Sequence, residues 1–197
     1  MIKEMELNMR EKVEVIRRME LIAIAKLIIP FCLLGAAMLF LWFAGPEVYT
    51  KYAAVFSVYS FMPIGGAVAV IPTGLGLGIP PANLIIFTLF TDALLALFLV
   101  WNFDYTKKVP FFGKLVEMTE VNGEKAIKKY KWAKRFGFIG LVLFVVFPLQ
   151  YTGSAVGAII GRLIGMTASM TWLAVVTGSL LRLLIATFIC IGILSFF

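Results

Sequence analysis

Three ionisable side chains stand inside long apolar stretches of this chain. Asp92, Arg162 and Arg182 each have neighbours that are almost all aliphatic, aromatic or small. A charged group at the centre of a membrane helix costs about 2.5–3.5 kcal/mol on insertion scales, so each one is a candidate functional residue. Asp92 could carry a proton or a cation, whereas Arg182 or Arg162 could attract an anionic group. Asp92 and Arg182 could instead form a static ion pair between the two halves of the chain.

A second set of candidate residues consists of prolines that interrupt apolar segments and of neutral residues beside them. Proline breaks a continuous helix and frees backbone N–H and C=O groups, which can bind a ligand where they line a cavity. Neutral side chains beside these breaks could also bind a ligand, or could simply satisfy the freed backbone groups. The candidates of this kind for a substrate or ion pathway are Pro63, Pro72, Pro148, Gln150, Thr152 and Gly153.

The composition excludes several other kinds of chemistry. There is no His, which excludes His-based acid–base catalysis, Ser-His-Asp triads and His-ligated zinc. Cys32 and Cys190 are too few for a disulfide framework and lack CxxC spacing. No pairing of a nucleophile with a base is visible, and the only carboxylates outside the soluble regions are Asp92 and Glu47. We therefore expect neither an enzyme nor a bound cofactor.

The elements that must position these residues are those of an integral membrane protein. Of the 197 residues, 61% are hydrophobic and 15% are charged, whereas a soluble protein has about 25% charged residues. Residues 21–43, 82–101 and 167–193 are each long enough to cross a bilayer core of about 30 Å as a helix. Residues 1–20 have balanced charges and helical spacing. They predict an amphipathic tail that lies on the membrane, packs on another subunit or is simply solvated.

Residues 53–79 and 138–165 are apolar but rich in Gly and Pro. Two prolines and five glycines within 53–79 would interrupt any continuous helix. If this segment is a re-entrant hairpin, the tail and the 102–137 loop share one side of the membrane, together with fourteen of the eighteen basic residues. The positive-inside rule favours that arrangement, which predicts a multi-pass protein of the cell membrane with the N-terminus and the loop cytoplasmic. The small residues could instead serve only close helix packing.

The two halves of the chain match each other weakly. Met62-Pro63 corresponds to Phe147-Pro148, and a turn led by Gly78 corresponds to one led by Gly165. If both broken segments are hairpins, they enter from opposite sides, which is an inverted-topology repeat with a site near the bilayer midplane.

The expected fold is therefore an all-α integral membrane protein with three full transmembrane helices and two re-entrant hairpins arranged as an inverted repeat. Its parts are the tail 1–20, the first span 21–43, the first repeat 53–101, the basic loop 102–137 and the second repeat 138–197.

The basic loop ends in a predicted helix at 123–137. Six of its residues are Lys or Arg, interleaved with Ile, Tyr, Trp and Phe. This pattern favours binding to anionic lipids, at about 1 kcal/mol per basic residue near the surface. Nucleic-acid binding is not expected beside two membrane segments. Membrane lipids and a small amphiphilic or lipid substrate are the expected partners. A homodimer would supply more protein to enclose a polar cavity than one chain offers.

Residues 144–166, FVVFPLQYTGSAVGAIIGRLIGM, follow Gly137-Phe-Ile-Gly-Leu and resemble the putative small multi-drug export protein family. The segment from Pro63 to Pro72 and the following Gly78-Ile-Pro-Pro are similar to the first half of that family. Residues 165–181 are in addition similar to the DedA membrane family, whose paired re-entrant hairpins are linked to lipid-carrier translocation. Both families carry charges in their hairpins that are missing here from 65–71 and 148–154, so a mechanism based on those charges is not implied.

The resemblance and the residues together predict a small membrane transporter. It would export an amphiphilic or cationic solute, coupled to protons through Asp92, from a midplane site between the two hairpins. A DedA-like lipid or lipid-carrier translocase and a non-transporting membrane scaffold are the alternatives.

Overall fold

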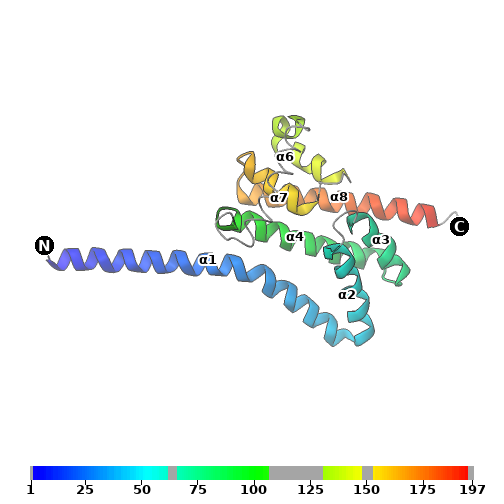
Figure 1. Cartoon of the computed structure of the whole chain (residues 1–197), viewed down its shortest axis with the longest axis horizontal. Helices are drawn as coiled ribbons and strands as arrows, with labels where there is room; N and C mark the ends of the chain where they lie inside the picture. The colour runs from blue at the N-terminus through cyan, green and yellow to red at the C-terminus, as the bar shows by residue number, and fades with distance from the viewer. Residues whose placement is uncertain (1, 62–65, 107–130, 148–152, 195–197) are drawn as a thin grey trace.

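The computed structural model describes residues 2–61, 66–106, 131–147 and 153–194, and these residues form seven helices without a strand. The predicted all-α class is therefore confirmed for the described part of the chain. The predicted sites Pro63, Pro148, Gln150 and Thr152 lie outside it, as does most of the basic loop. The helices are α1 (Ile2–Ala44), α2 (Pro46–Phe61), α3 (Gly66–Gly76), α4 (Pro81–Thr106), α6 (Lys131–Val146), α7 (Ser154–Leu163) and α8 (Ala168–Leu194) (Figure 1).

Three of these helices are long and apolar enough to cross a membrane. The candidate spans are Glu20–Ala44 in α1, Pro81–Phe103 in α4 and Ala168–Gly192 in α8, which agree closely with the predicted segments. Two shorter apolar helices cover Gly137–Val146 and Ser154–Leu163. The chain is therefore a multi-pass membrane protein. α1 and α8 run in one direction and α4 in the other (Figure 1).

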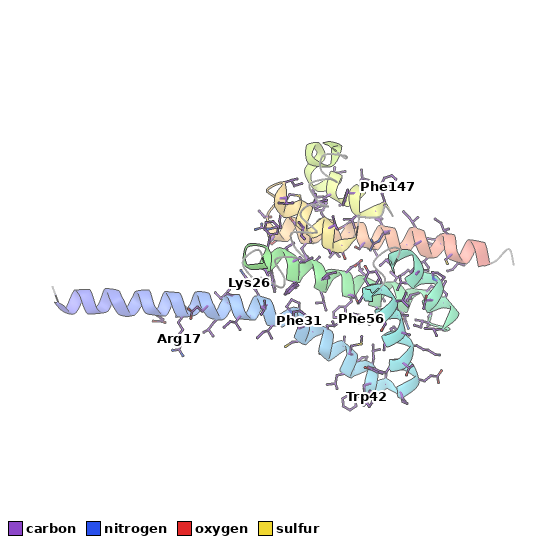
Figure 2. The ribbon with its side chains drawn as sticks, in the orientation of Figure 1. Arg17, Lys26, Phe31, Trp42, Phe56 and Phe147 are labelled. Atoms are coloured by element: carbon purple, nitrogen blue, oxygen red, sulfur yellow. The ribbon has the colours of Figure 1, made fainter. Side chains whose placement is uncertain are left out.

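The first helix is continuous through both the charged tail and the first span. Pro30 stands inside α1 and has no N–H to bond the carbonyl of Lys26. The side-chain amide of Asn102 in α4 donates to that carbonyl at 3.1 Å, so the freed acceptor is satisfied. The rings of Phe31 and Phe98 meet edge to face at 5.3 Å nearby. These two contacts hold the middle of α1 against the end of α4, whereas Arg17 points away from the other helices (Figure 2).

The segment between α1 and α4 begins and ends at the same end of the molecule. α1 ends and α4 begins on the right of Figure 1, and α2 and α3 occupy the chain between them. α2 crosses α4 at an angle and contacts it through side chains, because the ring of Tyr52 lies 4.9 Å from that of Phe87 and Tyr59 meets Asp92 (Figure 1). α3 then packs against α2 and returns to the start of α4.

The predicted interruption of residues 53–79 is confirmed, because α2 ends at Phe61 and α3 covers only Gly66–Gly76. The part of that prediction that concerns Pro72 is wrong. Pro72 lies within α3, where the helix continues to Gly76. Proline is tolerated in membrane helices when other groups satisfy the carbonyl that it frees. The turn between α3 and α4 comes six residues later, at Gly78.

The turn from α3 to α4 has the same backbone hydrogen bonds as the turn from α7 to α8. The Ile79 N–H donates to the Gly74 carbonyl at 3.0 Å, and the Met166 N–H donates to the Gly161 carbonyl at 3.0 Å. The second bond of each turn comes from a glycine with positive φ, Gly78 at +74° and Gly165 at +89°. This is the Schellman motif, in which a left-handed glycine ends a helix. Corresponding residues of the two turns are 87 positions apart.

The core has two parts, and α4 and α8 contribute to both. One part packs α4 and α8 against α6 and α7, around Phe144 and Ile160. The other packs α4 and α8 against α2 and α3, around Ile71 and Leu84. The α4–α8 pair is therefore the centre of the molecule, with the two shorter helix pairs on either side of it.

Candidate functional site

Asp92, Tyr59 and Arg182 form a cluster of polar side chains between α2, α4 and α8. We call these three residues the charged cluster. Arg182 Nη2 donates to Asp92 Oδ2 at 2.9 Å, and the Tyr59 hydroxyl donates to Asp92 Oδ1. The same Arg182 nitrogen lies 3.4 Å from the Tyr59 oxygen. Each carboxylate oxygen of Asp92 therefore has its own donor, and the two charges that stood far apart in the sequence are in contact.

The charged cluster is buried at mid-depth of two candidate spans. The relative exposure is 0% for Asp92 and 5% for Arg182. Asp92 is the twelfth residue of α4, roughly 16 Å from the start of the helix at 1.5 Å per residue. A carboxylate buried here without a partner would be strongly unfavourable. The opposite charge of Arg182 and the Tyr59 hydroxyl together offset that cost.

The local sequence explains why these side chains meet. On α4, Asp92 lies one turn after Thr88, so both face the same side of the helix. The contact between Tyr52 and Phe87 holds α2 against α4, and Tyr59 follows two turns later on α2. Because α8 packs against α4 along its length, Arg182 reaches the same depth from the second half of the chain.

The N-terminus of α7 lies beside the charged cluster. Ser154, the first residue of α7, is 3% exposed and lies close to the Tyr59 hydroxyl. Gly153 caps the helix with an extended backbone and no side-chain hydrogen bond. The first N–H groups of a helix are unpaired within the helix and carry partial positive charge. Gly153 and Ser154 therefore bring a fourth element, with hydrogen-bond donors, to the cluster.

Several buried donors near the cluster have no partner among the described residues. They are the Arg182 Nε, the Ser179 hydroxyl one turn earlier on α8 and the Thr88 hydroxyl on α4. Other hydroxyls in these helices bond their own backbone, as Ser57 does to Ala53 and Thr91 does to Phe87. The hydroxyls of Thr171 and Thr187 on α8 are unpartnered in the same way. In folded proteins such groups call for an explanation by function or by bound water.

Arg162 is not part of the charged cluster. Its Nη1 donates to the carbonyl of Met166 at 3.0 Å, and its guanidinium lies 5.6 Å from the ring centroid of Phe103. Phe103 is eleven residues beyond Asp92 on α4, or roughly 16 Å along the helix. Arg162 thus joins the turn after α7 to the end of α4. Pro72 is likewise outside the cluster, exposed on α3.

Tyr59 is the member of the charged cluster that the sequence analysis did not single out. It belongs to an aromatic face of α2, on which Tyr52, Phe56 and Tyr59 recur at helical spacing. That spacing could have indicated a packed face, although it could not have identified Asp92 as the partner. In the described part of the chain, no three His, Cys, Asp or Glu side chains gather into a group that could hold a metal ion.

Comparison with known proteins agrees with the resemblance found in the sequence. The profile of a family described as putative small multi-drug export protein matches residues 67–185, which is more than half of the chain. The match includes Asp92, Ser154 and Arg182, but it begins after Tyr59. No curated protein and no solved structure matches the chain significantly. On the strength of that match, the chain belongs to the putative small multi-drug export protein family.

Proposed function

We propose that this membrane protein transports a small amphiphilic solute, with the charged cluster as its binding site and Asp92 as its proton carrier. The family supports transport rather than enzymatic chemistry. The observation that carries the proposal is the contact between Asp92 and Arg182, buried at mid-depth between the two halves of the chain. Intramembrane ionisable residues of this kind mark substrate and proton pathways by default.

The charged cluster joins helices that would have to separate during transport. Asp92 and Tyr59 belong to the first half and Arg182 to the second, so their contacts hold the halves together. A proton on Asp92 removes the charge that attracts Arg182 and weakens this connection. Proton binding would thereby favour a second arrangement of the halves, in which the site opens.

We further propose that the α2–α3 and α6–α7 pairs are re-entrant hairpins of an inverted repeat. Three observations support this topology: α2 and α3 leave and return at the same end, α4 and α8 run in opposite directions, and the matched turns are 87 residues apart. The N-terminus and the basic loop would then share the cytoplasmic side.

Cysteine labelling tests the topology. In a Cys32→Ser/Cys190→Ser background, single cysteines at Tyr49 and Gly78 should react from the same side of intact cells or oriented vesicles. Reaction from opposite sides would contradict the hairpin arrangement.

Transport by purified protein in liposomes tests the function. We expect a proton gradient to drive movement of at least one of two fluorescent amphiphiles, cationic rhodamine 6G and anionic 8-anilinonaphthalene-1-sulfonate. Asp92→Asn should abolish the dependence on the gradient. If Asp92→Asn keeps full sensitivity to the gradient, Asp92 is not the proton carrier.

Glu47→Gln is the matched control for that experiment. Glu47 is an exposed carboxylate at the start of α2, paired with Lys51 at 2.9 Å. The hydrogen bond from Lys51 holds the pKa of Glu47 below its ordinary value. This variant makes the same carboxylate-to-amide change outside the candidate spans, and its transport should equal that of the unmodified protein.

A further inference from the structure

We infer that the solute binds the charged cluster through an oxyanion and enters together with one proton: the oxyanion pairs with Arg182, and the proton binds the Asp92 carboxylate. This inference rests on the binding site proposed above and adds the charge of the group that is recognised. It replaces the expectation of a cationic solute.

The charge balance of the buried cluster limits which ions can bind there. As it stands, the cluster holds one carboxylate and one guanidinium, both almost fully buried and in contact. Any ion that enters must break this pair and leave one of the two charges without its partner. An unpaired buried charge costs several kcal/mol, so the displaced group must become neutral.

Only one of the two groups can become neutral. A cationic solute that paired with Asp92 would displace Arg182, and a guanidinium does not lose its proton in a protein. An anionic solute that paired with Arg182 would displace Asp92, and a carboxylate can accept a proton. In that exchange the Asp92–Arg182 ion pair breaks, an O–H bond forms on Asp92 with a proton from water, and the Arg182–oxyanion pair forms. The site is neutral before and after.

No other charged group in the described helices competes for this role. The titratable groups that touch Asp92 are Tyr59 from α2 and Arg182 from α8. α7 contributes the neutral Ser154. α3 has no charged residue, and α1 has none after Lys26. The backbone carbonyl of Lys26 bonds Asn102, ten residues beyond Asp92 on α4 and roughly 15 Å along the helix. The charge balance therefore concerns Asp92 and Arg182.

The unused donors fit an oxyanion. Asp92 is held through a single nitrogen of Arg182, while Nε is buried without a partner. Nε and Nη2 together form the edge of a guanidinium that binds carboxylate, phosphate or sulfonate with two parallel hydrogen bonds. The Ser179 hydroxyl is fully buried and unpartnered one turn away on α8. Ser154 and the N-terminus of α7 reach the cluster through Tyr59. These groups offer more donors than one carboxylate uses.

The test measures proton uptake when an anion binds. The full chain is placed in phosphatidylcholine nanodiscs in weakly buffered solution with a pH-sensitive dye. Decanesulfonate is the probe, because its charge does not change with pH and any proton taken up must go to the protein. Decyltrimethylammonium has the same tail with a positive charge. We expect about one proton taken up per decanesulfonate bound, and none with decyltrimethylammonium. Binding of decanesulfonate without proton uptake, or binding of the cation alone, would overturn the inference.

Variants separate a specific site from partition into the lipid. Asp92→Asn/Arg182→Gln removes both charges without leaving one unpaired, and should lose both saturable binding and proton uptake. Arg182→Lys keeps the charge but loses the Nε edge, so affinity should fall more than about tenfold while one proton is still taken up. Ser154→Ala should weaken binding by about twofold to tenfold with the same proton count. Binding and uptake unchanged in the double variant would place the anion elsewhere.

A second type of nanodisc identifies the source of the oxyanion. Phosphatidylglycerol presents a phosphate headgroup in the membrane, whereas decanesulfonate is added from solution. If phosphatidylglycerol in the disc abolishes the proton uptake caused by decanesulfonate, a lipid headgroup competes for the same site. If the uptake persists, the site selects a soluble anion. Both outcomes are consistent with binding of an oxyanion. Absence of proton uptake in both types of disc would overturn the inference.

These outcomes are separate from those of the transport experiment. Gradient-driven transport of rhodamine 6G alone that requires Asp92 would support the proposed transport and overturn the inference of an anionic solute. Proton-linked binding of decanesulfonate without transport of any probe would support anion binding and contradict the proposed transport.

Discussion

The two halves of this protein share a backbone turn but contribute opposite chemistry to the charged cluster. α3 and α4 are joined by the same hydrogen-bonded turn as α7 and α8, at positions 87 residues apart. The first half supplies the carboxylate of Asp92, and the second supplies the guanidinium of Arg182. The residue 87 positions after Asp92 is Ser179, and the residue 87 positions before Arg182 is Leu95. Neither half can therefore complete the site alone, although both build the same scaffold.

The halves also differ in how tightly the scaffold is packed at its equivalent glycines. A Cβ on Gly74 would lie 2.5 Å from a terminal methyl of Leu84, and one on Gly161 would lie 2.4 Å from the Cγ2 of Thr171. Leu84 has a long side chain that can rotate. Thr171 is β-branched and stiff, and Leu141 closes the other side of Gly161 at 2.8 Å. The second turn should therefore tolerate less change than the first.

The largest effect is expected from removing one side of the ion pair. Arg182→Gln should lower the free energy of unfolding by about 3–5 kcal/mol, because Asp92 stays buried without its counter-charge. Asp92→Asn/Arg182→Gln should recover most of that loss, since no charge is left unpaired. Unfolding of the purified variants in detergent would measure both. Equal loss in the single and double variants would show that the charges do not depend on each other.

The hydroxyl of Tyr59 should contribute less than Arg182. Tyr59→Phe keeps the ring and removes the donor to Asp92, which should lower the free energy of unfolding by about 1.5–3 kcal/mol. Tyr52→Phe is the matched control on the same helix, because its ring still packs against Phe87. The control should stay within about 0.5 kcal/mol of the unmodified protein. If both variants behave alike, Tyr59 acts through packing alone.

Alanine at the two packed glycines tests the difference between the turns. Gly161→Ala should cost about 1–3 kcal/mol because Thr171 and Leu141 cannot both move aside, whereas Gly74→Ala should cost less than about 1 kcal/mol. The gain in helix propensity is the same at both positions and cancels in the comparison. Thr171→Ser should rescue part of the loss in Gly161→Ala by removing the nearest methyl. A larger loss of stability in Gly74→Ala than in Gly161→Ala would show that the first turn is the more tightly packed one.

The smallest difference between the halves is expected at the two left-handed glycines, where alanine should cost the same in both. Gly78→Ala and Gly165→Ala should each cost about 1–2 kcal/mol, because alanine is strained at positive φ. An added Cβ at either position meets nothing within 4 Å, so packing does not contribute. Gly76→Ala is the control, with equally open surroundings and no positive φ. Costs that differ clearly between Gly78 and Gly165 would show that the two turns are not equivalent.

Much of the architecture could be predicted from local patterns in the chain. The three spans and the turns at Gly78 and Gly165 follow from apolar length and from the placement of glycine. The family follows from the resemblance carried by residues 144–166. The effect of Pro72 was predicted wrongly, since the helix continues through it to Gly76. Proline is tolerated in a membrane helix when other groups satisfy the freed carbonyl. Asn102, which bonds the carbonyl freed by Pro30, is 76 residues away from its acceptor and gives no local signal.

By itself the sequence determined that this is an all-helical membrane protein, where its spans lie, and that Asp92 and Arg182 must be compensated inside it. Those conclusions depend on composition and on the free-energy cost of placing a charged side chain inside a membrane. That cost applies to each residue before its partner is known. Only the tertiary structure decided that Asp92 meets Arg182, 90 residues away, and Tyr59, 33 residues away, beside the start of α7. Helical periodicity defines the face on which a side chain lies, but which helix packs on that face depends on the packing of the whole chain.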